Sequence, residues 1–482
     1  MSGMNLTLAQ ALGWIPGGKL VGDGATILAR VHTDTRTLQA GDLFVALKGE
    51  RYDANEFLAD AKKAGAIAAI AHGGLAAAGL SGIEVADSKL ALGQLAAGWR
   101  AQFKLPLIAV TGSNGKTTVT QMIASILRAY KPEGTLATQG NHNNDIGVPL
   151  TLLRMNASHQ LAVVELGMNH PGEIANLARL TRPTVALVNN AQREHQEFMA
   201  TVEAVAWENG SVLSSLAGNG TAVFPEGDDY TAVWLQLAGS RACITFTGSG
   251  SATAVLTQGG GSATADISLA GAAWQTGHWQ VSATTPAGPL AFRLHIAGRH
   301  NVGNALAATA CALAAGVPLV AIAKGLEAFE PVKGRSRALS VPHTGRLLTV
   351  VDDTYNANPD SARAAIDVLA ELPGPRLLVL GDMGEVGSEG PAFHREVGLH
   401  ARERGIEQVF TLGDMAVDIA ISSGHGKHFG NDIAALNAAV LKALPDVASV
   451  LVKGSRFMKM ERVVEAIVAD SKQQHVESRH AA

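Results

Sequence analysis

The stretch LPLIAVTGSNGKTT, residues 105–118, joins an apolar run to a glycine-rich turn. Its apolar part predicts a buried strand over 105–110, and the residues after the turn predict an amphipathic helix over 119–129. Glycines let backbone N–H groups approach phosphate oxygens, and the N-terminus of the helix adds a partial positive charge. The turn therefore predicts a phosphate-binding loop made of Gly112, Ser113, Asn114, Gly115, Lys116, Thr117 and Thr118.

Two side chains of this loop have the chemistry that nucleotide binding needs. Lys116 would reach the terminal phosphates, and the Thr117 hydroxyl would bind Mg²⁺. The spacing, G-x-x-G-K-T, is two residues shorter between the glycines than the usual Walker A motif. A glycine-rich turn that binds nothing is the structural alternative. The strand before the turn and the helix after it favour the nucleotide site.

The composition of the whole chain excludes several classes of protein. At 482 residues the length suggests about three domains of ~150 residues. Apolar residues make up 47% and charged residues 17%, which is typical of a globular protein with a large core. The net charge of −4 gives no reason to expect a nucleic-acid partner.

Other features predict a cytoplasmic protein without a membrane span. Cys243 and Cys311 form no disulfide framework or metal motif, so we expect two buried thiols in a reducing compartment. The first residues, 1–18, lack the basic region and cleavage site of a signal peptide. The most apolar stretch, 305–322, contains Gly316 and Pro318 and fits a buried helix better than a membrane span.

The order of predicted elements indicates an α/β fold in three units. Strands and helices alternate through most of the chain, which predicts parallel sheets with helices on both faces. We place the units at 1–87, 88–316 and 317–482. Within the second unit a Thr-, Ser- and Gly-rich segment, about 240–297, predicts an antiparallel β insertion or edge.

Two residues near the predicted loop are candidates for metal binding. Glu165 ends a predicted buried strand over 161–166, and the carboxyl ends of parallel strands are where α/β folds bind ligands. Its carboxylate could hold a Mg²⁺ that bridges nucleotide and substrate, and a turn-forming acid is the alternative. His195 follows the next strand, where a surface or internally satisfied histidine is the simpler interpretation.

The third unit carries three polar strings at predicted strand ends or domain junctions. DDTYNANP (352–359) has more acids than helix capping requires. KGRSR (333–337) has three cations in five residues and is either a solvated turn or an anion clamp. KGSR (453–456) suits carboxylate or phosphate recognition.

Taken together, these strings resemble the Mur ligase family over nearly the whole chain. The resemblance is carried by the phosphate loop and by GNHNNDIGVP (140–149), ELG (165–167), GRHNV (298–302), KGR (333–335), DDTYNANP (352–359), GDMGEVG (381–387), KGSR (453–456), TDTR (33–36) and ALKGERYD (46–53). The last five most resemble the member that adds a dipeptide.

The resemblance implies a fold and a reaction. It implies an N-terminal domain that holds the UDP end of the substrate, a central ATPase domain and a C-terminal Rossmann-like domain that closes over ATP. The implied reaction joins D-alanyl-D-alanine to UDP-N-acetylmuramoyl-tripeptide through an acyl phosphate, with ATP and Mg²⁺, in a monomer. Arg335 and Asp353 would approach the nucleotide only on closure.

The resemblance also assigns roles to single residues. Lys116, Glu165, His195 and Arg335 would be catalytic. Thr117, Glu165 and His195 would hold Mg²⁺. ATP would contact the phosphate loop, Asn301, Arg335 and Asp353. The peptide and UDP substrates would contact Thr35, Arg36, Lys48, Gly49, Asn141, Asn143, Tyr355, Asn356 and Asn358.

This sequence departs from the family pattern at two positions. Related ligases carry a carbamylated lysine after His195 that helps hold a second Mg²⁺, and here that position is Asn209. A neutral amide would contact a metal-bound water or ligate weakly, and a helix residue without a metal role is the alternative. His142 stands where a phenylalanine is expected.

Three rival functions remain. The first two are the preceding, tripeptide-forming Mur ligase and a folylpolyglutamate synthase, both of which add single amino acids. The strings at 352–359 and 453–456 weigh against both. The third is a nucleotide-binding scaffold without activity, and the presence of Lys116, Glu165, His195 and Asp353 weighs against it.

Overall fold

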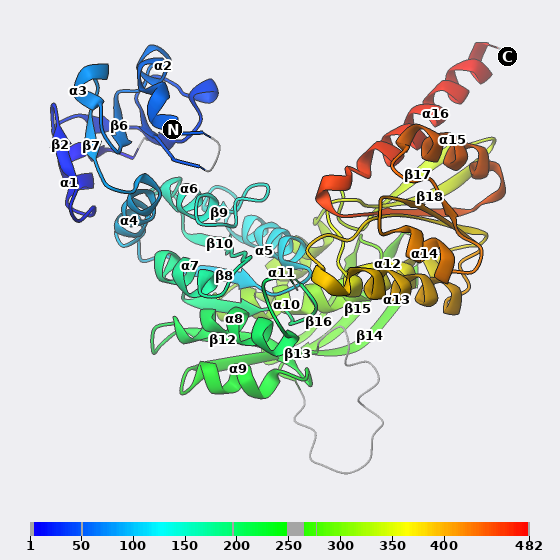
Figure 1. The fold of residues 1–482 in the computed structure, drawn as a ribbon. Helices are drawn as coiled ribbons and strands as arrows, with labels where there is room; N and C mark the ends of the chain where they lie inside the picture. Colours follow the sequence, from blue (N-terminus) through cyan, green and yellow to red (C-terminus); the bar gives the residue numbers. More distant parts are fainter. Residues whose placement is uncertain (1–3, 50–51, 195–196, 248–264, 276, 481–482) are drawn as a thin grey trace.

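The computed structural model describes residues 4–49, 52–194, 197–247, 265–275 and 277–480. The chain folds into three units that follow one another in space (Figure 1). The N-terminal unit lies at one end, the central unit in the middle and the C-terminal unit at the other end. Among the described residues, no helix combines the length and the apolar character needed to cross a bilayer.

The N-terminal unit is a small mixed sheet with short helices. Its five strands run in the order β2-β7-β6-β5-β4, and β2 pairs antiparallel to β7 while the other pairs are parallel. The bounds are β2 Lys19–Val21, β4 Arg30–His32, β5 Asp42–Val45, β6 Ala68–Ala71, β7 Ser81–Glu84, α1 Leu8–Leu12, α2 Leu58–Lys63 and α3 Leu75–Ala78. A separate ribbon pairs β1 (Leu6–Thr7) with β3 (Ile27–Leu28).

The central unit is built on a six-stranded parallel sheet in the order β13-β12-β11-β8-β10-β9. The strands are β8 Leu107–Thr111, β9 Thr135–Ala137, β10 Leu161–Glu165, β11 Val185–Val188, β12 Thr221–Glu226 and β13 Ala242–Thr247. The helices are α4 Ser88–Arg100, α5 Lys116–Tyr130, α6 Gly147–Leu153, α7 Glu173–Thr181, α8 Val202–Ser214, α9 Thr231–Ala238, α10 His300–Ala314 and α11 Leu319–Glu327. The predicted strand at 105–110 and helix at 119–129 correspond to β8 and α5.

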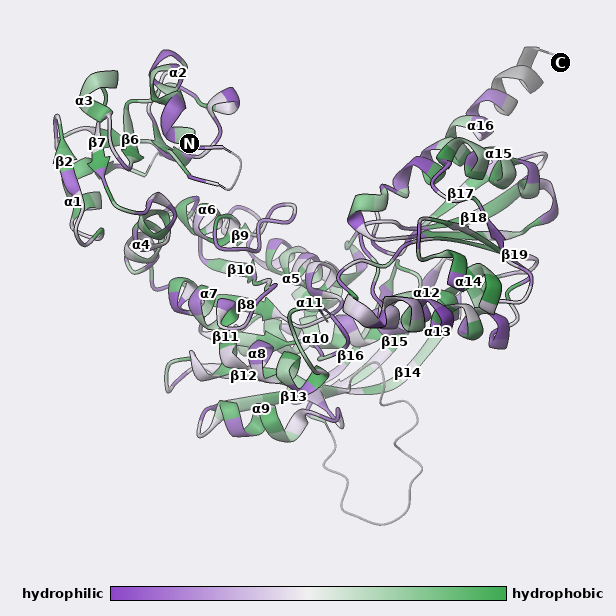
Figure 2. Cartoon of the chain, in the orientation of Figure 1, coloured by the Kyte–Doolittle hydropathy of each residue, from purple (hydrophilic) through white to green (hydrophobic). Residues whose placement is uncertain are grey.

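Alternate residues of β8 explain why this sheet is covered on both faces. Leu107 and Ala109 belong to the apolar cluster that includes α4, α7 and α8. Ile108 and Val110 belong to the cluster formed with α5 and α10. Successive side chains of a strand point to opposite faces, so a continuous apolar run is what a doubly covered parallel sheet requires. Figure 2 shows the same pattern as hydrophobic strands between helices with hydrophilic outer faces.

The Thr-, Ser- and Gly-rich segment is divided between two sheets. β13 joins the edge of the parallel sheet, beside β12. The described residues after it form a three-stranded antiparallel sheet: β14 Ser268–Gln275, β15 His278–Thr285 and β16 Gly288–Leu294. Residues 248–264 and 276 of this segment lie outside the described ranges.

Helix α11, which follows the boundary expected at residue 316, contacts helix α5 of the central unit. The Ser125 hydroxyl of α5 donates to the Gly325 carbonyl of α11 at 2.7 Å. A Cβ on Gly325 would come within 2.3 Å of the Ile126 Cα, so only glycine allows these helices to approach so closely. α11 therefore packs with the central unit, and we propose a boundary near residue 330 in place of 316.

The C-terminal unit repeats the doubly covered arrangement. Its sheet order is β17-β18-β22-β19-β20-β21, with only the β17–β18 pair antiparallel among the described strands. The strands are β17 Arg337–His343, β18 Arg346–Asp353, β19 Arg376–Gly381, β20 Gln408–Leu412, β21 Lys427–His428 and β22 Ser449–Lys453. The helices are α12 Pro359–Ala370, α13 Gly390–Glu403, α14 Val417–Ser422, α15 Ile433–Ala443 and α16 Glu461–His480. The carboxyl ends of β18 and β22 face the central unit across the cavity described next.

Candidate active site

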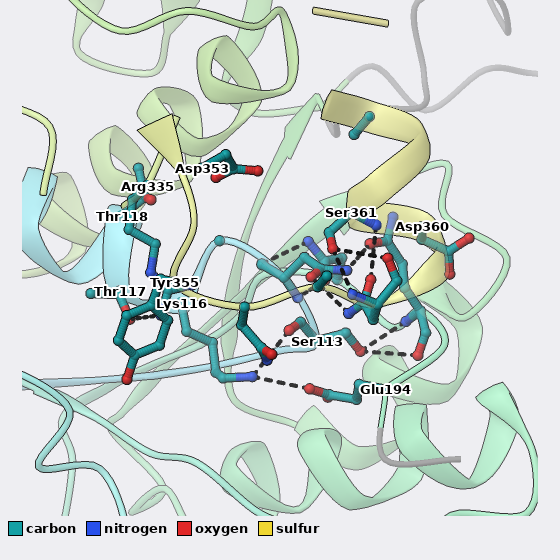
Figure 3. Close-up of a pocket in the computed structure, with 18 of the residues that line it drawn as sticks. Ser113, Lys116, Thr117, Thr118, Glu194, Arg335, Asp353, Tyr355, Asp360 and Ser361 are labelled. Atoms are coloured by element: carbon teal, nitrogen blue, oxygen red, sulfur yellow. Dashed lines mark hydrogen bonds and ion pairs between the residues drawn. The ribbon is translucent and has the colours of Figure 1, made fainter. Parts of the chain in front are cut away.

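A cavity of about 1480 Å³ separates the glycine-rich turn after β8 from the C-terminal unit. Residues from both units line it, including Lys116 and Thr117 from α5 and Arg335, Asp353 and Tyr355 from the third unit (Figure 3). A site assembled from two units can change its shape when the units move. The cavity therefore suits a reaction that needs both open and closed states.

The backbone of the turn requires glycine at two positions. Gly112 has φ +131°, and a Cβ there would lie 3.0 Å from the backbone nitrogen of Asn189. Gly115 has φ +80° and is the N-cap residue of α5. The turn thus directs the N-terminus of α5 into the cavity, which is the arrangement predicted for phosphate binding.

The Lys116 ammonium group has three acceptors. Its Nζ donates to the carbonyls of Gly112 at 2.5 Å and Ser113 at 3.1 Å, and to Glu194 Oε2 at 3.1 Å. The Lys116 and Glu194 side chains are only 16% and 6% exposed. Sequence reasoning missed Glu194, and its place beside His195 in the string REHQE was the only signal. Glu194 neutralises the lysine charge at the edge of the loop.

Thr117 and Glu165 are joined by a hydrogen bond next to the loop, and their oxygen atoms could bind a cation. The Thr117 hydroxyl donates to Glu165 Oε1 at 3.1 Å, and the Asn143 amide donates to the same oxygen at 2.8 Å. Glu165 Oε2 is buried and has no hydrogen-bond partner among the residues that the structure describes. A buried carboxylate oxygen of this kind needs a partner, and Mg²⁺ prefers such oxygen ligands. These residues therefore fit a magnesium ion.

Other residues would have to complete the coordination of such an ion. Within the described ranges, no cluster of three or more His, Cys, Asp or Glu side chains could hold a metal alone. His195, the third predicted ligand, lies outside the described residues. Phosphate oxygens and water are the usual remaining ligands of Mg²⁺ at nucleotide sites.

The third unit places a positively charged side chain, that of Arg335, next to Thr117. Arg335 Nη2 donates to the Thr117 hydroxyl at 3.3 Å, and the guanidinium stacks on Tyr355 with 3.9 Å to the ring centroid. Arg335 Nε is buried without a partner among the described residues. This approach is the one expected on domain closure, and Arg335 already lies at the loop in the structure. An anion at the loop would meet both Lys116 and Arg335.

The acidic end of β18 and the loop that follows it are fixed by contacts within the third unit. Asp353 Oδ1 accepts from the Ser336 backbone N–H at 2.9 Å, and Asp353 Oδ2 accepts from Lys453 Nζ at 2.7 Å. Lys453 also donates to the Asn356 carbonyl at 2.7 Å. Lys453 therefore orients this loop, whose residues Asp353, Tyr355, Asn356 and Asn358 all line the cavity.

Asn301 begins a chain of amides that ends at the phosphate loop. It is 2% exposed, donates to the Ala297 carbonyl at 2.7 Å and accepts from the Asn304 amide at 2.9 Å. Asn304 Oδ1 accepts from Asn189, which also donates to the Asn114 carbonyl. The contact of Asn301 with ATP stays a prediction, and the hydrogen bonds of Asn301 and Asn304 show that it also supports the loop.

The predicted UDP-side residues lie elsewhere. Thr35, Arg36, Lys48 and Gly49 belong to the N-terminal unit, which the central unit separates from the C-terminal one (Figure 1). Arg36 forms an exposed pair with Asp34, Nη2 to Oδ2 at 2.7 Å, and its hydrogen bonds lower the pKa of that carboxyl to about 2. Asn141 and Asn143, by contrast, line the main cavity, and their contact with the muramoyl peptide stays a prediction.

Asn209 has a structural role that the sequence did not reveal. Its side chain is 1% exposed, and its Oδ1 accepts from the Thr111 hydroxyl at 2.5 Å and the Gly112 backbone N–H at 3.0 Å. Its Nδ2 donates to Glu194 Oε1 at 3.2 Å. The amide is therefore already occupied, which favours the alternative in which Asn209 holds the loop and binds no metal.

The remaining expectations about this region are simple. Glu208, the neighbour of Asn209, does not line the cavity and accepts from the backbone N–H groups of Gly172 and Ile174 at the start of α7. His142 is exposed on its loop, so a histidine in place of phenylalanine has no packing cost there.

Comparison with known proteins shows the family. Residues 110–312 match the Mur ligase middle domain, and residues 337–482 match the Mur ligase, glutamate ligase domain. The chain is 41% identical over 465 residues to the UDP-N-acetylmuramoyl-tripeptide–D-alanyl-D-alanine ligase of Escherichia coli (strain K12), covering 96% of this chain and 98% of that protein. It is 33% identical to the ligase of the same name from Bacillus subtilis (strain 168), covering 92% of this chain and 94% of that protein.

Solved structures agree with the sequence comparison. A crystal structure of MurF from Acinetobacter baumannii superposes with a TM-score of 0.87 at 34% identity and covers 96% of this chain and 99% of that one. MurF ligase from Thermotoga maritima in complex with ADP has a TM-score of 0.77 at 24% identity, covers 92% of this chain and 98% of its own, and shows the shared fold.

Proposed function

The chain belongs to the Mur ligase family, and on that premise we propose that it joins D-alanyl-D-alanine to UDP-N-acetylmuramoyl-tripeptide with cleavage of ATP to ADP and phosphate. The product is a peptidoglycan precursor. The observation that carries the proposal is the meeting of Lys116, Thr117, Glu165 and Arg335 at one loop, shared by two units. A cytoplasmic location and a monomeric state remain predictions.

The proposed reaction has two bond exchanges. A carboxylate oxygen of the tripeptide attacks the γ-phosphorus of ATP, ADP leaves, and an acyl phosphate forms. The amine of D-alanyl-D-alanine then attacks the acyl carbon, the tetrahedral intermediate loses phosphate, and the amine loses a proton. Both steps need negative charge to be neutralised in a water-poor cavity.

The side chains of this protein divide that work. Lys116 from the central unit and Arg335 from the third unit supply positive charge at the loop, and Asn143 orients the Glu165 carboxylate. Thr117 and Glu165 would hold Mg²⁺, which would supply further charge stabilisation for the phosphoryl group when bound. We propose that Asp353, Tyr355, Asn356 and Asn358 contact the nucleotide and the incoming amine, and that Asn141 contacts the muramoyl peptide.

The choice of acceptor tests this proposal. We expect ADP release from ATP, Mg²⁺ and UDP-N-acetylmuramoyl-tripeptide to depend on D-alanyl-D-alanine, and mass spectrometry to detect the pentapeptide product. Single amino acids, each supplied at the same concentration with the matching UDP-linked acceptor, serve as controls. A single amino acid that supported faster ADP release than the dipeptide would favour the rival ligases.

A second expected result concerns carbon dioxide. The Asn209 amide is occupied by Thr111, Gly112 and Glu194, and the sequence has no lysine between Lys131 and Lys324 to form a carbamate. The rate should therefore be the same in CO₂-depleted buffer and in bicarbonate, and the mass of the central peptides should show no carbamate. Reversible stimulation by bicarbonate would contradict this expectation.

A further inference from the structure

Arg193 connects the central unit to the start of α12 in the third unit. Its guanidinium donates to Asp360 through Nε, at 3.2 Å to each oxygen, and through Nη2, at 2.5 Å. Its backbone N–H donates to Asp360 Oδ2 at 2.9 Å. Asp360 lies in the first turn of α12, where the helix dipole favours a negative charge. One arginine thus holds the beginning of this helix by both side chain and backbone.

A second carboxylate of the third unit completes the contact. Glu396 on α13 accepts from Arg193 Nη1 at 2.7 Å and Nη2 at 3.0 Å, and from Arg363 Nη1 at 2.8 Å. The two arginines balance the two carboxylates, and Arg193 and Asp360 are only 20% and 23% exposed. Hydrogen bonds from Arg193 lower the pKa of the Glu396 carboxyl. Forked pairs of this kind are specific in geometry as well as charge.

The residues on either side of Arg193 bind the phosphate loop. Gln192 donates its backbone N–H to the Ser113 hydroxyl at 2.8 Å and accepts from the Asn114 amide at 2.6 Å. Glu194 pairs with Lys116. Arg193 is therefore fixed between two residues that both contact the loop, and a shift of the loop would move its guanidinium.

Asn358 also joins the start of α12 to the phosphate loop. The Asn358 side chain caps α12 by accepting from the Ser361 N–H at 2.8 Å. Its amide nitrogen donates to Asn114 Oδ1 at 3.0 Å. Figure 3 shows Asp360 and Ser361 close to each other, on the side of the view away from Arg335 and Thr117. The start of α12 thus rests on the phosphate loop and on Arg193 together.

We propose that Arg193 is a positioning residue that couples the state of the phosphate loop to closure of the third unit. Its clamp on Asp360 and Glu396 holds α12 in the orientation that also brings Arg335 to Thr117. This inference rests on the proposed function, because the closed cavity matters only for a reaction that both units share. A plain surface ion pair between the units would give the same contacts without the coupling.

Three variants of the full-length enzyme separate these two interpretations. Arg193→Ala removes the clamp, and Asp360→Asn weakens it from the other side without an added cavity. Arg395→Ala is the matched control, because Arg395 on α13 pairs with Asp418 at 3.6 Å within the third unit. Thermal unfolding confirms that each variant is folded before the other measurements.

Two measurements on these variants test the coupling. Small-angle scattering is recorded with and without Mg²⁺ and a non-hydrolysable ATP analogue, and kcat and KM are measured in the ligase assay. We expect the analogue to compact the wild type and Arg395→Ala but not Arg193→Ala or Asp360→Asn. The kcat should fall roughly tenfold in the two clamp variants, which corresponds to about 1.4 kcal/mol, with the Kd of the analogue changed by less than about threefold.

The outcomes are distinct. Normal compaction and kcat in both clamp variants, or equal losses in Arg395→Ala, would overturn the inference. So would a loss that appears only in the Kd of the analogue. Scattering with the analogue needs no peptide substrate, so failure of the wild type to ligate the dipeptide would reject the proposed function while leaving the coupling test intact.

Discussion

Lys116→Ala should remove almost all ligase turnover. The lysine of a phosphate loop stabilises the charge of the transferring phosphoryl group, and loss of one such preorganised donor costs roughly 3–4 kcal/mol of barrier, or about 10²- to 10³-fold in kcat. The measurement is ADP release under saturating ATP, Mg²⁺, UDP-N-acetylmuramoyl-tripeptide and D-alanyl-D-alanine. A folded variant with a near-normal rate would show that the glycine-rich loop is not the nucleotide site.

Because Lys116 forms an ion pair with Glu194, the Lys116→Ala variant needs a control for lost stability. Lys116→Ala removes one ionic partner of a carboxylate that is only 6% exposed, so some stability should be lost together with activity. The double variant Lys116→Ala with Glu194→Gln also removes the charge of that carboxylate. We expect it to recover part of the lost melting temperature while turnover stays low. Recovery of both would mean that the lysine acts on folding alone.

The features that could be predicted from the sequence are those set by residues that lie close together along the chain. The strand over β8, the loop at 112–118 and the helix after it follow from residues that are neighbours in sequence. Glu165 was found because a carboxylate at the end of a buried strand is unusual whatever surrounds it. The three-unit α/β architecture follows from the alternation of apolar strands and amphipathic helices.

The remainder depends on contacts between distant positions. Asn209 meets Thr111 across 98 positions, and Arg193 meets Asp360 across 167, so no spacing rule connects them. In sequence Asn209 is a polar helix residue and Arg193 is one charge in a charged string. Their roles exist only because two parallel strands and a second unit bring them to the same loop.

Glu165→Gln should produce the other large loss of activity. Glutamine has nearly the same shape, and its amide oxygen can still accept from Thr117 and Asn143, so the packing of β10 should survive. The position of the buried Oε2 atom would then hold an N–H₂ group, which is a donor and cannot ligate a cation. Loss of a charged oxygen ligand should reduce kcat by about 100-fold or more.

The dependence on Mg²⁺ distinguishes this explanation from a general loss of activity. The Mg²⁺ concentration for half-maximal rate should rise at least about tenfold in Glu165→Gln, since the remaining ligands must hold the ion with less negative charge. Glu203→Gln, an exposed carboxylate in the first turn of α8, is the matched control and should behave as the wild type. Thermal unfolding of both variants in the absence of Mg²⁺ separates metal binding from stability. An unchanged Mg²⁺ requirement in a folded Glu165→Gln enzyme would place the ion elsewhere, because the buried Oε2 atom of Glu165, which has no hydrogen-bond partner among the described residues, would then have no part in holding it.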